Sequence, residues 1–186
     1  IARACNYHSW ALRHIRSLIP VDVAKTLACS IVGARLDYCN ALLNGASNKN
    51  IAVLQRLQNS LARVVLQEPR SAHVTAMLQS LHWLPVRQRI QHKVAVLTYK
   101  AKILSTPPYL HSLLIDYSAN TSMSLRSSDR PLLALRRTRT DFGRRAFSVA
   151  ATTLWNNLPT HLQLSPTLNT FRKHLKTLLF SNAFAQ

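Results

Sequence analysis

Acidic residues are scarce in this sequence. Its 186 residues include 24 Lys plus Arg but only 6 Asp plus Glu, which gives a formal net charge of +18. Polymerases and nucleases that use two metal ions hold Mg²⁺ with several converging carboxylates. The six acids are scattered, and the closest pair in sequence, Asp129 and Asp141, lies in an Arg-rich stretch that would neutralise both. The sequence therefore predicts no two-metal catalytic centre.

Glycine is equally scarce, with three in the whole chain. Gly-rich phosphate loops need several glycines at fixed spacing, so neither a P-loop nor a G-x-G-x-x-G turn is present. The G-x-S-x-G sequence that positions a hydrolase nucleophile is absent too. The eight His residues show no metal-ligand spacing. We therefore expect that this chain alone is not an enzyme and uses no cofactor.

Cysteine and long apolar runs are also sparse. Cys5, Cys29 and Cys39 are an odd number in a long chain, which argues against a secreted disulfide framework and favours an intracellular setting. Cys5 and His8 are spaced like half of a zinc site, but the second half is missing. No run approaches the roughly 18–20 apolar residues that span a bilayer. Because the chain starts at Ile1 without a signal-peptide pattern, we expect it to be cut from a longer protein.

Helical periodicity is what the sequence does contain. Hydrophobic residues make up 47% of the chain and recur every three or four positions between the prolines. The pattern predicts a mainly α fold, a helical bundle with a basic loop or short β-hairpin and a C-terminal helix. The composition divides it into residues 1–116, a helical bundle, residues 117–145, the Arg-rich loop or hairpin, and residues 146–186, a C-terminal helical segment.

Individual elements follow from the same periodicity. We expect helices over about 21–43, 50–67, 85–104, 109–115 and 148–158, and a last helix capped by Ser165 with Pro166 in its first turn. In the first of these, the predicted buried face includes Tyr38 and Leu42. Residues 132–135 are candidates to pair with residues 145–149 as a short hairpin.

Arginine dominates one stretch. Residues 126–145 hold seven Arg against two Asp, a local net charge of +5. The guanidinium group presents a planar fork of donors that suits phosphate oxygens and can stack on bases, so the cluster predicts nucleic-acid binding. The predicted binding residues are Arg126, Arg130, Arg136, Arg137, Arg139, Arg144 and Arg145.

Other residues support or compete with this interpretation. Arg89, Lys93 and Lys100 form a second basic stripe on the helix predicted from Pro85. Phe142 and Phe147 are candidates to stack on bases, but Phe147 fits a core position better. The alternative for the Arg residues is a solvated face, and an anionic membrane would need an adjacent exposed apolar face. We predict a nucleic-acid partner and no membrane partner.

Seven segments together resemble a known family. Their order and spacing are similar to those in the C-terminal part of reverse transcriptases from non-LTR (LINE-type) retrotransposons, particularly the Jockey-related clades. The segments are ARLDYCNALLNG (34–45), LQRLQNSLARVV (54–65), LHWLPVRQRIQHKVAVLTYKA (81–101), PPYLHSLL (107–114), SLRSSDR (124–130), GRRAFSVAATTLWNNLP (143–159) and FRKHLKTLLF (171–180).

The resemblance implies the thumb and post-thumb region of a larger polyprotein. Its partners would be template RNA, RNA:DNA or DNA duplex, and the upstream palm and fingers of the parent polyprotein. It implies an intracellular location, in nucleus and cytoplasm, within a retroelement ribonucleoprotein. The paired Asp residues of the family's palm are absent here, so no catalytic residue is carried over. The alternative is an orphaned or decayed retroelement fragment with no independent biochemical function.

Overall fold

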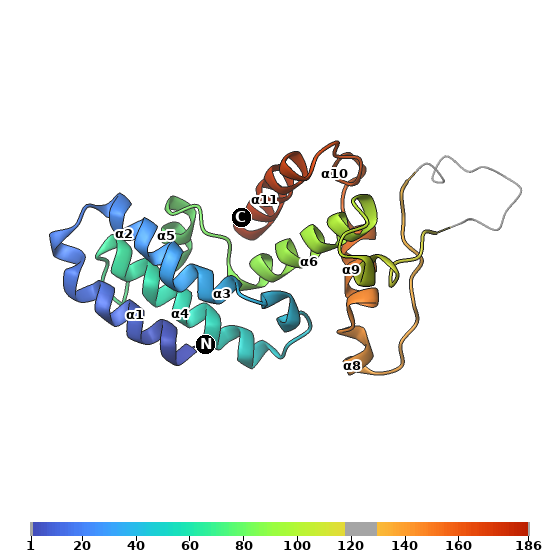
Figure 1. Cartoon of the computed structure of the whole chain (residues 1–186). Helices are drawn as coiled ribbons and strands as arrows, with labels where there is room; N and C mark the ends of the chain where they lie inside the picture. The colour runs from blue at the N-terminus through green and yellow to red at the C-terminus, as the bar shows by residue number, and fades with distance from the viewer. Residues whose placement is uncertain (1, 118–129, 186) are drawn as a thin grey trace, which may run out of the picture. The chain divides into compact units, whose positions relative to one another are not determined.

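The computed structural model describes residues 2–117 and 130–185, and its regular structure is helical (Figure 1). Within these residues there is no strand, and the isolated β-bridge found there joins Asp116 to Leu133 in antiparallel fashion. The mainly α fold predicted from the periodicity is therefore confirmed.

The chain forms two compact units. Unit 1 comprises residues 1–90 and 179–186, and unit 2 comprises residues 91–178. The two boundaries fall inside the helices α6 (Val86–Ile103) and α11 (Leu168–Phe184). The three-part division predicted from composition follows the Arg-rich stretch instead, because composition marks exposed segments whereas compactness follows buried contacts.

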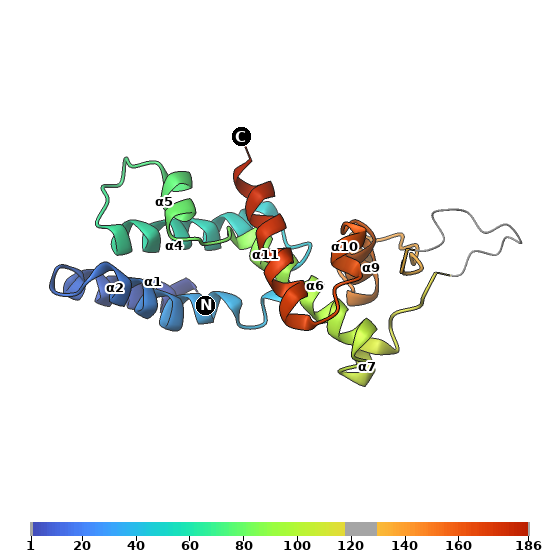
Figure 2. The same ribbon diagram turned by 90° about the horizontal axis from the view of Figure 1, so that it is seen from above.

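Unit 1 is built from helices around one apolar core. Figures 1 and 2 both show α1 beside α4, and residues from both helices enter the core cluster, Cys5 and Leu12 from α1 and Leu61 and Val65 from α4. Ser47 caps α4 by accepting a hydrogen bond from the Asn50 amide at 3.4 Å. The elements are α1 (Ala2–Ile15), η1 (Arg16–Leu18), α2 (Val21–Leu27), η2 (Ala28–Gly33), α3 (Ala34–Asp37), η3 (Asn40–Leu43), α4 (Asn48–Leu66) and α5 (Val74–Ser80).

The continuous helix predicted over residues 21–43 is wrong. The segment passes through a π-helix, η2, and then breaks at Cys39, which has a left-handed φ of 51°. An α-helix gains about 40° with every four residues, and the wider π turn offsets this drift. Tyr38 and Leu42, predicted to be buried, are 75% and 82% exposed. Apart from Gly33, the buried positions follow a step of four: Ala24, Ala28, Val32, Leu36 and Asn40.

Unit 2 has an aromatic core. Tyr99 from α6 stacks on Phe171 from α11 with ring centroids 4.6 Å apart, and Trp155 lies within 6.5 Å of both rings. All three side chains are almost fully buried. Apart from its parts of α6 and α11, the described helices of this unit are α7 (Pro108–His111), α8 (Asp141–Arg144), α9 (Phe147–Asn156) and α10 (Thr160–Gln163).

Two local predictions in unit 2 need correction. The predicted pairing of residues 132–135 with 145–149 does not occur, because residues 147–149 begin α9 and Leu133 pairs with Asp116 instead. The described part of the basic stretch contains no strand and is irregular apart from the short helix α8. The cap of α11 is Thr167, which accepts from the Thr170 amide at 3.2 Å, while Ser165 is buried and its carbonyl accepts from the Tyr99 hydroxyl at 2.9 Å.

Candidate nucleic-acid interface

The C-terminal end of α9 holds the start of the basic loop. The Asn156 side chain accepts from the Leu133 amide at 2.9 Å and donates to the Leu133 carbonyl at 2.8 Å. The buried Trp155 donates its indole N–H to the Pro131 carbonyl at 2.7 Å. These bonds satisfy backbone groups that have no helix or sheet partner, so residues 131–133 are fixed on the core of unit 2.

Beyond this anchor the chain is exposed. Residues 136–145, which we call the Arg segment, contain five Arg and one Asp, a net charge of +4. All five guanidinium side chains are exposed, and Arg144 forms an ion pair with Asp141 on the same turn. The segment therefore presents Arg136, Arg137, Arg139 and Arg145 without a carboxylate partner among the described residues.

A tight turn shapes the middle of the Arg segment. The Thr140 hydroxyl accepts from the Gly143 amide at 3.0 Å and caps α8. A Cβ on Gly143 would lie 3.1 Å from the Thr140 hydroxyl oxygen and 3.2 Å from the Thr138 Cβ, which is closer than side chains normally pack. Glycine therefore allows the turn to close. Phe142, within this turn, is 82% exposed.

An exposed aromatic ring among guanidinium groups has the chemistry of a single-strand binding surface. Bases stack on aromatic faces regardless of sequence, while Arg groups follow the phosphates. The structure separates the two Phe candidates, because Phe142 is exposed whereas Phe147 is half-buried at the start of α9. Phe142 is therefore the candidate for base stacking.

Arg126 and Arg130 are the first two residues of the predicted binding set. Arg126 lies outside the described residues. Arg130 turns inward, and its Nη2 lies 3.4 and 3.2 Å from the carbonyl oxygens of Asn156 and Leu158. Its Nε is buried and has no partner among the described residues. Arg130 thus helps to anchor the loop and is less available to a phosphate than the Arg segment.

The second basic stripe is divided between the two units. Arg89 belongs to unit 1, where its guanidinium forms a bidentate ion pair with Asp37 at 2.9 and 2.5 Å. Lys93 is exposed and Lys100 half-buried in unit 2, and neither forms an ion pair within the described residues. The stripe is regular in sequence, but Arg89 already has an anionic partner.

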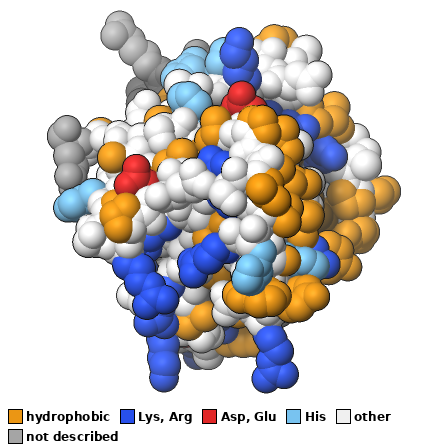
Figure 3. Space-filling model, turned by 90° about the vertical axis from the view of Figure 1, so that its left-hand side faces the viewer, with side chains coloured by type: hydrophobic (Ala, Val, Ile, Leu, Met, Phe, Trp, Pro, Cys, Tyr) orange, Lys and Arg blue, Asp and Glu red, His pale blue; other side chains and the backbone are white. Residues whose placement is uncertain are grey.

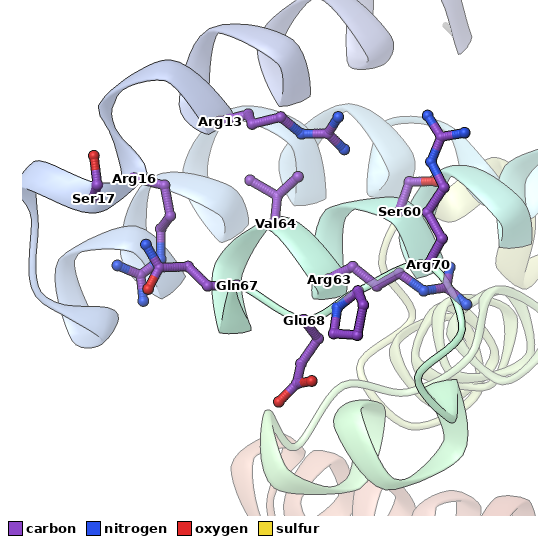
Figure 4. A pocket seen from close by; sticks show the side chains of 10 residues that line it. Arg13, Arg16, Ser17, Ser60, Arg63, Val64, Gln67, Glu68 and Arg70 are labelled. Carbon is purple, nitrogen blue, oxygen red and sulfur yellow. The ribbon is translucent and has the colours of Figure 1, made fainter.

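A further basic group is not evident from the sequence. Arg13, Arg16, Arg63 and Arg70 line a cavity of unit 1 of about 590 Å³, together with one acid, Glu68 (Figure 4). They come from the end of α1, from η1, from α4 and from the connection after α4. Because they are isolated along the chain, no local charge run marks them, and only the pairing of α1 with α4 brings them together.

The remaining chemistry of the described residues is sparse. No three His, Cys, Asp or Glu side chains are grouped so that they could hold a metal ion. None of the helices described has both the length and the apolar character needed to cross a bilayer. Burial raises the pKa of the Cys5 thiol, although the nearby positive charge of Arg35 acts in the opposite direction.

Comparison of the chain with protein-family models, curated proteins and solved structures finds no match. The resemblance described above therefore stays a prediction.

Proposed function

We propose that this chain is a nucleic-acid-binding segment of a non-LTR retrotransposon reverse transcriptase. Its role is to hold the template RNA and the RNA:DNA hybrid during RNA-directed DNA synthesis, while the catalytic centre belongs to the palm of the parent polyprotein. The chain by itself has no polymerase activity.

The exposed Arg segment is the observation that carries this proposal. Its guanidinium groups are displayed on a loop whose start is hydrogen-bonded to the core, and Phe142 lies among them. A net charge of +18 attracts nucleic acids of any sequence, both single-stranded and double-stranded. Phosphate contacts of this kind fix position on a nucleic acid without reading its sequence.

Fluorescence anisotropy with labelled 20-nucleotide RNA, and with an RNA:DNA hybrid of the same sequence, tests the proposal. If the four guanidinium groups of the Arg segment that have no carboxylate partner each neutralise one phosphate, log K should fall by about 2.8 per log unit of salt on single strands and by about 3.6 on a duplex. Scrambling the sequence should not change the affinity. Absence of binding at low salt, or binding that does not respond to salt, would contradict the proposal.

A second candidate is an orphaned fragment that lacks the surface its helices need. It is favoured by large apolar side chains that stay exposed on unit 1, among them Trp10, Leu18, Tyr38 and Leu42. Such a fragment would unfold without a cooperative transition and would bind hydrophobic dyes in its native buffer. Differential scanning calorimetry distinguishes the two candidates, because a cooperative heat-absorption peak argues for a chain that folds on its own.

A further inference from the structure

The cavity at the ends of α1 and α4 concentrates positive charge. It is lined by four guanidinium groups, and its one acid, Glu68, forms no ion pair within the described residues. Figure 4 shows the Glu68 carboxylate pointing away from the guanidinium groups of Arg13 and Arg70. The cavity volume of about 590 Å³ falls within the roughly 300–1,000 Å³ that is usual for small-ligand sites.

One of the four cations is buried. Arg16 is only 9% exposed, and its Nε and Nη1 donate to the carbonyl oxygens of Val65 and Ile19 at 2.7 and 2.8 Å. These bonds satisfy two of its five N–H donors and place carbonyl dipoles beside it, but they supply no full counter-charge. Burying a cation without a counter-ion is costly, so an anion in the adjacent cavity would stabilise this arrangement.

Arg63 also has unused donor capacity. Its Nη2 lies 3.4 Å from the Ala72 carbonyl oxygen, a long hydrogen bond, and its buried Nε has no partner among the described residues. Burying an N–H group without an acceptor normally destabilises the folded state. Because this Nε is shielded from solvent, Arg63 can attract an anion in the cavity through its charge but not through a hydrogen bond from Nε.

The helix dipole alone explains only some of the four Arg residues at the cavity. Helix carbonyls carry partial negative charge at a C-terminus, and both α1 and α4 end beside the cavity, so basic residues are favoured there. That explanation fits Arg16, which caps carbonyl groups. It also covers Arg13 in the last turn of α1 and Arg63 in the last turn of α4. It does not cover Arg70, which lies outside the helices, is exposed, and makes no hydrogen bond or ion pair within the described part of the chain.

We propose that this cavity is a phosphate-binding site in which Arg13 and Arg70 contact the anion from two sides and Arg16 and Arg63 neutralise it from the wall. Guanidinium forks match phosphate oxygens in geometry as well as in charge. The end of unit 1 where α1 and α4 finish faces the viewer in Figure 3, and blue Lys and Arg side chains outnumber red acidic ones there. The phosphate comes either from a nucleic-acid backbone, which extends the proposed function, or from a small phosphate-bearing molecule.

Isothermal titration of the full chain with inorganic pyrophosphate, at low and constant ionic strength, tests the site. The double variant Arg13→Gln, Arg70→Gln should bind pyrophosphate at least about tenfold more weakly, since two charge-assisted contacts are lost. The control is Arg3→Gln, Arg56→Gln, which removes two exposed charges from α1 and α4 outside the cavity and should stay within about twofold of wild type.

Three results would overturn the site: no saturable pyrophosphate binding, equal weakening in the cavity and control variants, or no weakening in the cavity variant. Because Arg13 and Arg70 are exposed, both variants should keep the wild-type thermal transition. If the double variant does not fold, the single Arg70→Gln change, which lies in a turn, gives the same test with about half the loss in free energy.

RNA binding by the same variants identifies the source of the phosphate. A nucleic-acid backbone is the source if the cavity variant loses RNA affinity beyond the control and pyrophosphate competes with RNA. A small molecule is the source if only pyrophosphate binding is lost. The variant Arg136→Gln, Arg137→Gln, Arg139→Gln should keep its pyrophosphate affinity, so failure of the Arg segment and failure of the cavity are separate outcomes.

Discussion

Single side chains in unit 2 fix a loop that has little regular structure. The Asn156 side chain bonds to both the amide and the carbonyl group of Leu133, and the Trp155 indole bonds to the Pro131 carbonyl group. Three hydrogen bonds therefore hold residues 131–133. Trp155 and Asn156 belong to the LWNNLP part (154–159) of one of the segments on which the family resemblance rests. Their role is to join the core of unit 2 to the exposed Arg segment.

The Asn156→Ala variant tests this role. It removes both hydrogen bonds to Leu133 and leaves half-buried backbone groups without partners, so the free energy of unfolding should fall by about 1–3 kcal/mol. Urea unfolding followed by circular dichroism measures the change. Asn157→Ala is the matched control on the adjacent exposed residue and should change stability by less than about 0.5 kcal/mol. Equal effects of the two variants would refute the anchoring role.

Phe142 should contribute to binding and not to stability. Its ring is 82% exposed, so Phe142→Ala should leave the thermal transition unchanged. Loss of one stacked base should weaken single-stranded RNA binding by about 1–3 kcal/mol. Tyr109→Ala removes another exposed aromatic ring, 70% accessible and outside the Arg segment, and should not affect RNA affinity. Anisotropy titrations of both variants check this, and a normal affinity for Phe142→Ala would exclude stacking there.

The cysteines should differ in reactivity. Burial raises the pKa of the Cys5 thiol, whereas Cys29 and Cys39 are exposed. A disulfide reagent such as DTNB should therefore label two thiols rapidly near pH 8 and the third only after unfolding. Because the folded pKa of Cys5 lies above its unfolded value, stability is retained below the unfolded value and declines as the pH rises beyond it. Rapid labelling of all three thiols would contradict the burial of Cys5.

At the scale of elements, ion pairing decides which basic residues are free. Arg89 links the start of α6 to Asp37 at the end of α3, within unit 1, through two hydrogen bonds. Lys102 likewise pairs with Asp116 in unit 2. The few acids in the chain thus neutralise some of the basic residues. The Arg segment retains most of its charge because, of its Arg residues, Arg144 alone forms an ion pair within the described residues, with Asp141.

The Arg89→Gln variant separates a structural from a binding role. Breaking the bidentate pair with Asp37 should lower the free energy of unfolding by about 1 kcal/mol, a modest value because both groups are partly exposed. RNA affinity should fall no further than in Arg56→Gln, which removes an exposed charge without a partner. Chemical denaturation and RNA titration of both variants measure the two effects. A larger loss of RNA affinity in Arg89→Gln than in Arg56→Gln would show that Arg89 belongs to the binding surface.

At the scale of the whole molecule, periodicity gave the fold class and missed what depends on long-range contacts. The helices near residues 50–67 and 85–104 form as expected because their apolar stripes are regular. Tyr38 and Leu42 are exposed because a π turn and the left-handed Cys39 interrupt the pattern, and neither has a sequence signature. The exposure of the Arg segment agrees with its local charge. The Arg-lined cavity was missed because its residues meet only after α1 packs on α4.

We propose that RNA binding by this chain depends on the Arg segment and not on net charge alone. The most direct measurement is the salt dependence of RNA binding by two variants that each lose three charges from exposed residues of unit 2. One carries Arg136→Gln, Arg137→Gln and Arg139→Gln, and the control carries Arg172→Gln, Lys173→Gln and Lys176→Gln. We expect the slope of log K against log salt to become shallower by about 2 in the first variant and to stay near the wild-type value in the control. Equal slopes in the two variants would contradict it.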